Sequence, residues 1–205
     1  MTKENKEILK KDGNFRNFLL ARILSQLAMT GFAFYTVYAV GAHHVSESHI
    51  GIMTGLLLGV QIVANPIMGW AGDRWSNHAV MRVGMTAATL SALLAWWAPS
   101  AGFFYLVYIL TGIANVSVWT TGLAIIHEFG KESERPVYIG MANTLVAPAN
   151  LLSPFLGGFL ASISGYPAAF FASAIAGLSA VLAYQFLVKD PRANKKGQVS
   201  QEAPA

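Results

Sequence analysis

The basic residues of this chain lie at alternate gaps between six long apolar stretches, which extend from about residue 15 to residue 188. All fourteen Lys and Arg residues lie before the first stretch, just inside it, beside the second and fourth gaps, or after the sixth stretch. The other three gaps, residues 41–49, 99–102 and 164–167, contain none. Because Lys and Arg accumulate on the cytoplasmic side of membrane proteins, this pattern predicts an even number of spans and cytoplasmic N and C termini.

The apolar stretches are long enough to be transmembrane helices. We place them at residues 15–40, 50–72, 79–98, 103–127, 137–162 and 167–188, and each reaches the roughly 20 residues that cross a bilayer. The short links make consecutive helices antiparallel neighbours. The sequence therefore predicts an all-α membrane protein of the plasma (inner) membrane, a bundle of six transmembrane helices over residues 15–190. A basic cytoplasmic segment (1–14) precedes it and a disordered cytoplasmic tail (191–205) follows.

Composition agrees with a membrane location and argues against other partners. Hydrophobic residues make up 54% of the chain and charged residues 12%, against roughly 25% charged in soluble domains. The basic pI of 9.4 is explained by topology and by attraction to anionic lipid headgroups, so we expect membrane lipid and no nucleic acid as a partner. The absence of cysteine excludes disulfides and thiolate metal sites. The His43-His44-Val-Ser-Glu47-Ser-His49 loop is better explained as solvated, and we expect no metal and no cofactor.

The link between the second and third stretches carries a motif. It contains Gly69, Asp73 and Arg74 in the order Gly-Trp-Ala-Gly-Asp-Arg-Trp-Ser-Asn-His. This resembles the GxxxDRxGRR signature of the major facilitator superfamily, which lies between the second and third helices of a six-helix half. The signature has Gly and two basic residues where this chain has Ser76, Asn77 and His78, as in the weaker copy of C-terminal halves.

The fifth stretch extends the resemblance. Residues 135–144 and 153–158 are similar to the eleventh helix of bacterial facilitators, although two glycines of the antiporter signature are replaced by Ala149 and Ser153. An antiport mechanism therefore does not carry over. The chain from Asn14 to Arg192 is similar to one C-terminal facilitator half.

The resemblance implies a cytoplasmic gate. An aspartate at a helix end needs a cation or the N-terminus of another helix, and the candidates for Asp73 are Arg74, Arg82 and the start of the fifth helix. The alternative is a solvated pair in a loop. The predicted gate residues are Gly69, Asp73, Arg74, Arg82 and Arg135.

The resemblance also implies that the first and fourth helices line a central cavity and that the second and fifth contact another half. Polar residues recur on single faces of these helices, where they face water or one another. The alternative for each is an interhelical hydrogen bond. For Arg22, the alternatives to anion binding are that its side chain extends to the membrane interface, or that it forms a structural pair. The predicted cavity residues are Arg22, Gln26, Thr30, Gln61, Asn65, Tyr108, Thr111, Asn115, Trp119, Asn143 and Asn150.

Small residues and prolines predict close helix packing. They are Gly51, Gly55, Gly59, Pro148, Pro154, Gly157 and Gly158. The Ala/Leu-rich third and sixth helices are expected to face lipid.

Two ways of making a transporter remain open. Facilitator halves are parallel repeats, so two copies of one six-helix chain can form an isologous homodimer, with the second helix of one against the fifth of the other. This homodimer, moving a small polar or amphipathic solute by alternating access, is our leading hypothesis. The alternative is a C-terminal half that needs a separate N-terminal half. No Asp or Glu lies in mid-span, which favours uniport, or symport through groups on another chain, over a carboxylate proton relay.

An intramembrane enzyme is the remaining alternative. A Gly-x-Ser-Gly nucleophile motif is approached only by Gly177-Leu-Ser179-Ala, and no His lies in the middle of a span. We therefore expect no enzymatic activity.

Overall fold

The computed structural model describes residues 3–130 and 132–192, and all regular structure in this part of the chain is helical. Six helical segments are long and apolar enough to cross a membrane, which confirms the predicted number of spans. They are Gly13–His43, Glu47–Arg74, Asn77–Trp97, Phe103–Ile126, Glu132–Ser164 and Tyr166–Leu187.

Four of the six spans are interrupted or extended by non-α turns. The first consists of α2 (Gly13–Ala28), a 3₁₀ turn η1 (Met29–Gly31) and α3 (Phe32–His43). The fourth consists of α6 (Phe103–Val116), a π-helical turn η2 (Ser117–Thr121) and α7 (Gly122–Ile126). The sixth consists of α9 (Tyr166–Leu182) and a π-helical turn η4 (Ala183–Leu187).

The second and third spans are the single helices α4 (Glu47–Arg74) and α5 (Asn77–Trp97). The fifth is a 3₁₀ turn η3 (Glu132–Glu134) followed by α8 (Arg135–Ser164), and a short helix α1 (Lys3–Lys11) precedes the bundle.

Local sequence determines where the helices begin and end. The Asp12 side chain accepts a hydrogen bond from the Phe15 N–H (2.8 Å) and caps α2, and Ser76 Oγ caps α5 by accepting from the His78 N–H (3.1 Å). Such caps satisfy amides that the helix itself cannot. Between α8 and α9, Gly165 has a φ of 79°, a conformation that favours glycine.

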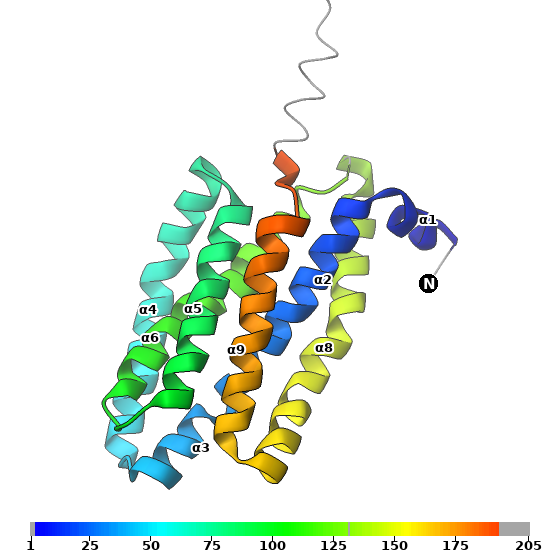
Figure 1. The fold of residues 1–205 in the computed structure, drawn as a ribbon. Helices are drawn as coiled ribbons and strands as arrows, with labels where there is room; N and C mark the ends of the chain where they lie inside the picture. Colours follow the sequence, from blue (N-terminus) through cyan, green and yellow to red (C-terminus); the bar gives the residue numbers. More distant parts are fainter. Residues whose placement is uncertain (1–2, 131, 193–205) are drawn as a thin grey trace, which may run out of the picture.

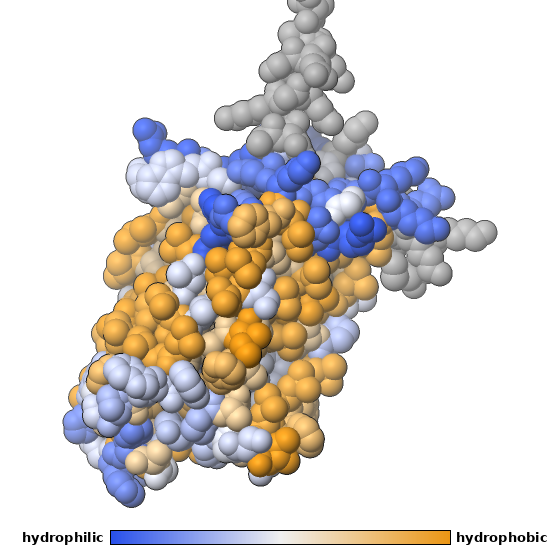
Figure 2. Space-filling model, viewed as in Figure 1, coloured by the Kyte–Doolittle hydropathy of each residue, from blue (hydrophilic) through white to orange (hydrophobic). Residues whose placement is uncertain are grey.

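The helices pack in the order α4, α6, α5, α9, α2 and α8, so α4 and α8 lie at opposite edges of the bundle (Figure 1). The N-terminal helix α1 and the end of α9 lie at the same end of the bundle. Hydrophilic residues form a band across this end, above a mostly hydrophobic surface (Figure 2). Because α2, α5 and α8 all begin here, with the Lys and Arg residues described above, we call it the basic end.

The third span is more deeply buried within the chain than the two edge helices, although one of its faces stays exposed. In α5, 56% of the most apolar window is buried within the chain, against 17% in α4 and in α8. Val83 and Leu90 on its other face are exposed. That the third span faces lipid there stays a prediction, while the rest of the helix packs closely inside the bundle. The reason is its small residues: a Cβ on Gly84 would overlap the Ser117 side chain of η2, so the missing side chain is what lets the two backbones approach.

Replacing Gly84 with Ala should therefore lower the thermal unfolding temperature of the purified protein in detergent. Overpacking a close helix contact costs about 1–3 kcal/mol, which corresponds to a shift of several degrees. Gly51→Ala in α4 is the matched control, because a Cβ there meets no atom within 4 Å and Ala favours a helix over Gly. An equal shift in both variants would contradict the close contact.

Candidate functional site

The interruptions in the first and fourth spans lie on either side of a pocket. Non-α backbone at membrane depth is tolerated only where it is buried in protein or lines a cavity. In η1, the Gly31 N–H donates to Ser173 Oγ of α9 (2.8 Å). In the fourth span, the carbonyl of Gly122, directly after η2, accepts from Arg22 Nη1 (2.7 Å). Side chains from other helices thus satisfy backbone groups at both breaks.

The pocket has a volume of about 220 Å³, which is small beside the roughly 300–1,000 Å³ of sites that enclose drug-sized ligands. The first span, the fourth span and α8 all contribute to its lining. Five of the predicted cavity residues and one predicted packing proline line it: Gln26, Thr30, Asn115, Trp119, Asn150 and Pro154.

One donor in this pocket has no partner. Gln26 is only 3% exposed, and its Nε2 makes no hydrogen bond within the part of the chain that the structure describes. The neighbouring hydroxyls are satisfied, because Ser153 Oγ donates to the Gln26 carbonyl (3.0 Å) and Thr30 Oγ1 lies 2.6 Å from Ser153 Oγ. A buried unpaired amide costs about 1–3 kcal/mol. The pocket is therefore suited to a solute with a hydrogen-bond acceptor.

The other predicted cavity residues lie outside this pocket. Tyr108 and Thr111 are buried inside the helix bundle. Tyr108 Oη lies 2.5 Å from Thr36 Oγ1, and Thr111 Oγ1 donates to the Val107 carbonyl (2.7 Å). Asn65 on α4 accepts from Thr120 Oγ1 (3.0 Å), while its own Nδ2 donates to the carbonyl of Gln61. Gln61 is partly exposed on α4, Asn143 is exposed on α8, and Arg22 is described next.

Arg22 joins two helices beside the pocket. It is 5% exposed and lies one helical turn from Gln26, toward the basic end. Among the described residues, no acidic side chain forms an ion pair with it. Its hydrogen bond to the Gly122 carbonyl gives it a structural partner. A Cβ at Gly122 would lie 3.4 Å from Arg22 Cζ.

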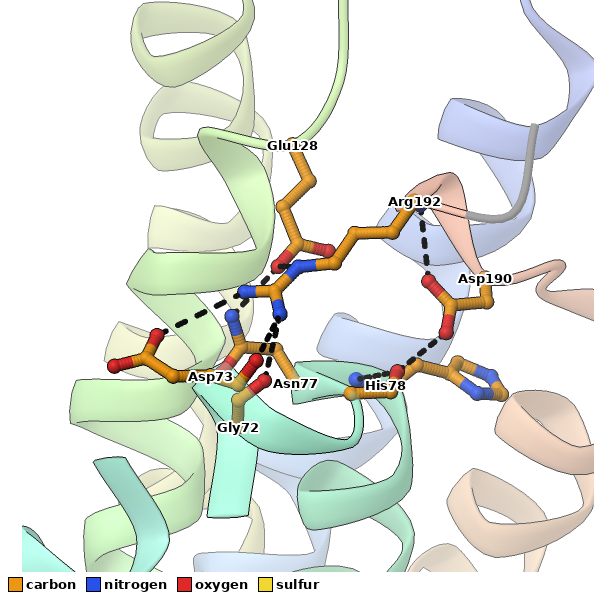
Figure 3. Close-up of polar contacts among 8 residues, drawn as sticks. Gly72, Asp73, Asn77, His78, Glu128, Asp190 and Arg192 are labelled. Carbon is orange, nitrogen blue, oxygen red and sulfur yellow. Dashed lines mark hydrogen bonds and ion pairs between the residues drawn. The ribbon is translucent and has the colours of Figure 1, made fainter. Parts of the chain in front are cut away.

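A second polar cluster closes the basic end around Arg192 (Figure 3). Arg192 Nε contacts Glu128 Oε1 at 2.7 Å, and Nη1 donates to the carbonyls of Gly72 (2.7 Å) and Asp73 (3.3 Å). The Asp73 carboxylate lies 4.0 Å from Arg192 Nη2 and its side chain is 88% exposed. One guanidinium thus joins the end of α4 to the segment after α7.

Three further contacts connect this cluster to α5 and to the segment after η4. Asn77 Nδ2 donates to Glu128 Oε1 (2.6 Å), and Ser76 Oγ donates to Asp190 Oδ2 (2.5 Å). The other Asp190 oxygen accepts from the Arg192 N–H (3.0 Å). Four of the six spans therefore meet at this cluster.

The predicted gate residues are only partly gathered here. Asp73 contacts Arg192 rather than Arg74 or Arg82. Arg82 donates to Gln185, and the described contacts do not join Arg74 or Arg135 to Asp73. Gly69 has open space around its Cβ position.

Sequence reasoning missed Arg192 and Asp190, and it left Glu128 out of the predicted gate. The available signal was the loss of two basic residues from the motif, where this chain has Asn77 and His78, so that a cation for a nearby carboxylate has to come from elsewhere. Arg192 supplies that cation from beyond the last helix. The predicted tail begins at residue 191, and its residues 193–205 lie outside the described part of the chain.

Burial raises the pKa of Glu128 above its ordinary value. The hydrogen bond from Asn77 and the charge of Arg192 act in the opposite direction and do not fully compensate. Glu128 therefore binds a proton more tightly in the folded than in the unfolded chain, and its contribution to stability decreases as the pH rises through the raised value.

Replacing Arg192 with Gln should raise the Glu128 pKa further and destabilise the protein most at alkaline pH. The expected loss is about 1–2 kcal/mol at pH 8, because a buried carboxylate loses a partially exposed cation. The loss should be smaller at about pH 4.5, because a carboxyl group whose pKa is raised takes up its proton earlier as the pH falls. Thermal unfolding in detergent at the two pH values measures this.

Lys189→Gln is the control for charge, because the Lys189 side chain forms no ion pair among the described residues. The double variant E128Q/R192Q should lose the additional pH dependence. If R192Q loses the same amount of stability relative to the wild type at both pH values, the role assigned to Glu128 is contradicted.

In the described part of the chain, no group of three or more His, Asp or Glu side chains could hold a metal ion. The site instead consists of an amide-lined pocket in mid-membrane and a charged cluster at the basic end.

Comparison with known proteins agrees with this architecture. The chain is 25% identical over 155 residues to multidrug resistance protein 1 of Bacillus subtilis (strain 168), covering 76% of this chain and 40% of that protein. It is 28% identical over 124 residues to the vesicular acetylcholine transporter of Drosophila melanogaster, covering 60% and 22%. It is 24% identical over 145 residues to the class B tetracycline resistance protein of Escherichia coli, covering 71% and 36%.

The chain thus spans two-fifths or less of the length of these relatives. The family model of the Major Facilitator Superfamily matches residues 18–205, which is most of the chain and includes all six spans except the beginning of the first. This integral membrane protein therefore belongs to the Major Facilitator Superfamily.

Proposed function

We propose that this chain carries a small solute across the plasma (inner) membrane by alternating access, with its termini in the cytoplasm and two copies forming the complete pathway. The observation that carries the proposal is the pocket between two interrupted spans, in which the buried Gln26 amide lacks a partner. Members of this family are transporters, and such a pocket gives this one a place to hold its solute.

The lining residues support a polar or amphipathic solute. Amides of Gln26, Asn115 and Asn150 can donate and accept hydrogen bonds, and the Trp119 ring offers an apolar surface. The pocket lining includes no acidic residue, so a counter-charge for a cationic solute, or a proton-carrying carboxylate, would have to come from another chain. Relatives named for tetracycline and acetylcholine provide the first solutes to test.

The proposed gate is the Arg192 cluster. Its contacts join the α4–α5 link to the segments after α7 and η4, so the basic end cannot open between these helices while the cluster is intact. Opening would require Arg192 to leave Glu128.

The dimer is supported by the faces that the single chain leaves uncovered. Large apolar side chains are exposed along both edge helices, such as Leu58 and Ile62 on α4 and Leu151 on α8. Because the two halves of a facilitator are parallel repeats, a two-fold axis along the membrane normal can place α4 of one copy against α8 of the other. On α8, a Cβ on Gly157 would meet Thr30 and Phe34 of the same chain, so this glycine serves packing against the first span.

The alternative is a pairing with a separate N-terminal half. The longer relatives support it, because the part that matches this chain is a minor share of each. The same edge helices would then meet a different chain.

The pocket is tested by Asn150→Leu. Removing one amide from the lining should reduce solute counterflow in proteoliposomes about three- to tenfold, as expected from one neutral hydrogen bond. A panel that includes tetracycline and acetylcholine identifies the solute first. Asn143→Leu makes the same substitution on the same helix, at an exposed position outside the pocket, and should leave counterflow unchanged. Equal losses in both variants would argue against the pocket.

The dimer is tested by cysteine cross-linking, since the natural chain has no cysteine. Leu58 and Leu151 lie equally far, in residues, from the helix ends at Arg74 and Arg135. Membranes that contain one tagged copy with Leu58→Cys and another with Leu151→Cys should yield a mixed disulfide after mild oxidation. Leu178→Cys on α9, paired with either variant, should not. Only background cross-linking in every pair would favour the separate half.

A further inference from the structure

A groove separate from the solute pocket follows the outer face of α5. Its floor is formed by residues three or four apart on this helix, from Ala79 to Leu90, so they share one helical face. The walls come from α6 on one side and from α9 and η4 on the other. The groove has a volume of about 540 Å³ and a length of about 16 Å, at 1.5 Å per residue.

The groove is polar at one end and apolar at the other. Arg82 and Gln185 line it near the basic end, while Leu90, Leu110 and Ile113 line it farther into the membrane. Thr86 lies between them, with its hydroxyl bonded to the Arg82 carbonyl (2.9 Å). The face that α5 and α9 present is mostly hydrophobic below the hydrophilic band (Figure 2). The groove thus has the polarity of a lipid molecule, with its head toward the basic end.

Arg82 is a cation without a counter-ion. It lies in the second turn of α5 and is only partly exposed. Its Nη1 donates to the neutral Gln185 Oε1, and its Nε is buried without a partner. No acidic side chain among the described residues forms an ion pair with it. A charge at the edge of the hydrocarbon region is costly unless a partner of opposite sign compensates it.

We propose that this groove binds a phospholipid with an anionic headgroup, from the leaflet that faces the basic end. The lipid phosphate accepts hydrogen bonds from the Arg82 guanidinium, which is well suited to bind phosphate oxygens. One acyl chain lies along α5 between Val83 and Leu90, against the walls from α6 and α9. Basic pockets between transmembrane helices recognise anionic lipids in this way. The single negative charge of an anionic lipid compensates the positive charge of Arg82. A zwitterionic lipid adds a second positive charge close to Arg82.

Native mass spectrometry of the full chain in detergent tests the proposal. Phosphatidylglycerol and phosphatidylcholine with the same acyl chains are added in turn, and the fraction of protein with bound lipid is measured. The wild-type chain should bind phosphatidylglycerol at least about tenfold more tightly, because both lipids offer the same phosphate to Arg82 but only phosphatidylcholine adds a cation, and its repulsion by the Arg82 guanidinium is enough for that ratio. Equal affinity for the two lipids in the wild type would overturn the proposal without any variant.

Two pairs of variants locate the lipid. Arg82→Gln should remove the preference for phosphatidylglycerol, while Arg74→Gln, an exposed cation at the same end that does not line the groove, should keep it. Thr86→Trp should weaken binding of both lipids by filling the groove, and Leu152→Trp, exposed on α8 away from the groove, should not. An unchanged preference in Arg82→Gln would place the anionic lipid elsewhere. Full competition by glycerol 3-phosphate at the lipid's own concentration would show that the groove contributes no binding.

Discussion

Inside a membrane every backbone N–H and C=O must find a partner within the protein, and this requirement shapes the molecule more than any single contact. It explains the helical architecture of the described chain. It also limits where helices can depart from α geometry. The breaks in the first and fourth spans occur where Ser173 Oγ and the Arg22 guanidinium reach exposed backbone groups. The pocket lies between these breaks. The two side chains bond to the backbone groups there, so the chain can depart from regular helix without leaving a backbone N–H or C=O unpaired in lipid.

Arg22 illustrates how a charge can serve such a backbone. A guanidinium is costly in the membrane, yet here it binds a carbonyl oxygen directly after the π-helical turn. Because its position is determined by that bond, it lies beside the pocket without lining it. The polar character of the pocket then depends on neutral amides, which offer directional hydrogen bonds and no net charge.

Much of this arrangement could be predicted from the sequence, because hydropathy and charge act residue by residue along the chain. The six spans follow from them, and so do the polar faces that supply Gln26, Asn115 and Asn150 to one pocket. The same reasoning failed for Tyr108 and Thr111. They share a face of α6 with Asn115, but neighbouring helices cross that face at an angle, so it contacts α3 and α5 at one depth and the pocket at another. Helical periodicity carries no information about the crossing.

The partner of Glu128 could not be found for a different reason. Arg192 is 64 residues away along the chain, in a segment with little hydropathy signal, and only the folded bundle brings the two together. This placement has a practical consequence for anyone who handles the protein. A fluorescent reporter or affinity tag fused directly after residue 192 would be joined to the residue whose guanidinium holds the end of α4 and the segment after α7 together. Mechanical load or bulk applied there would act on the contacts of Arg192 with Glu128 and with the end of α4, so a spacer should separate the protein from any fused partner.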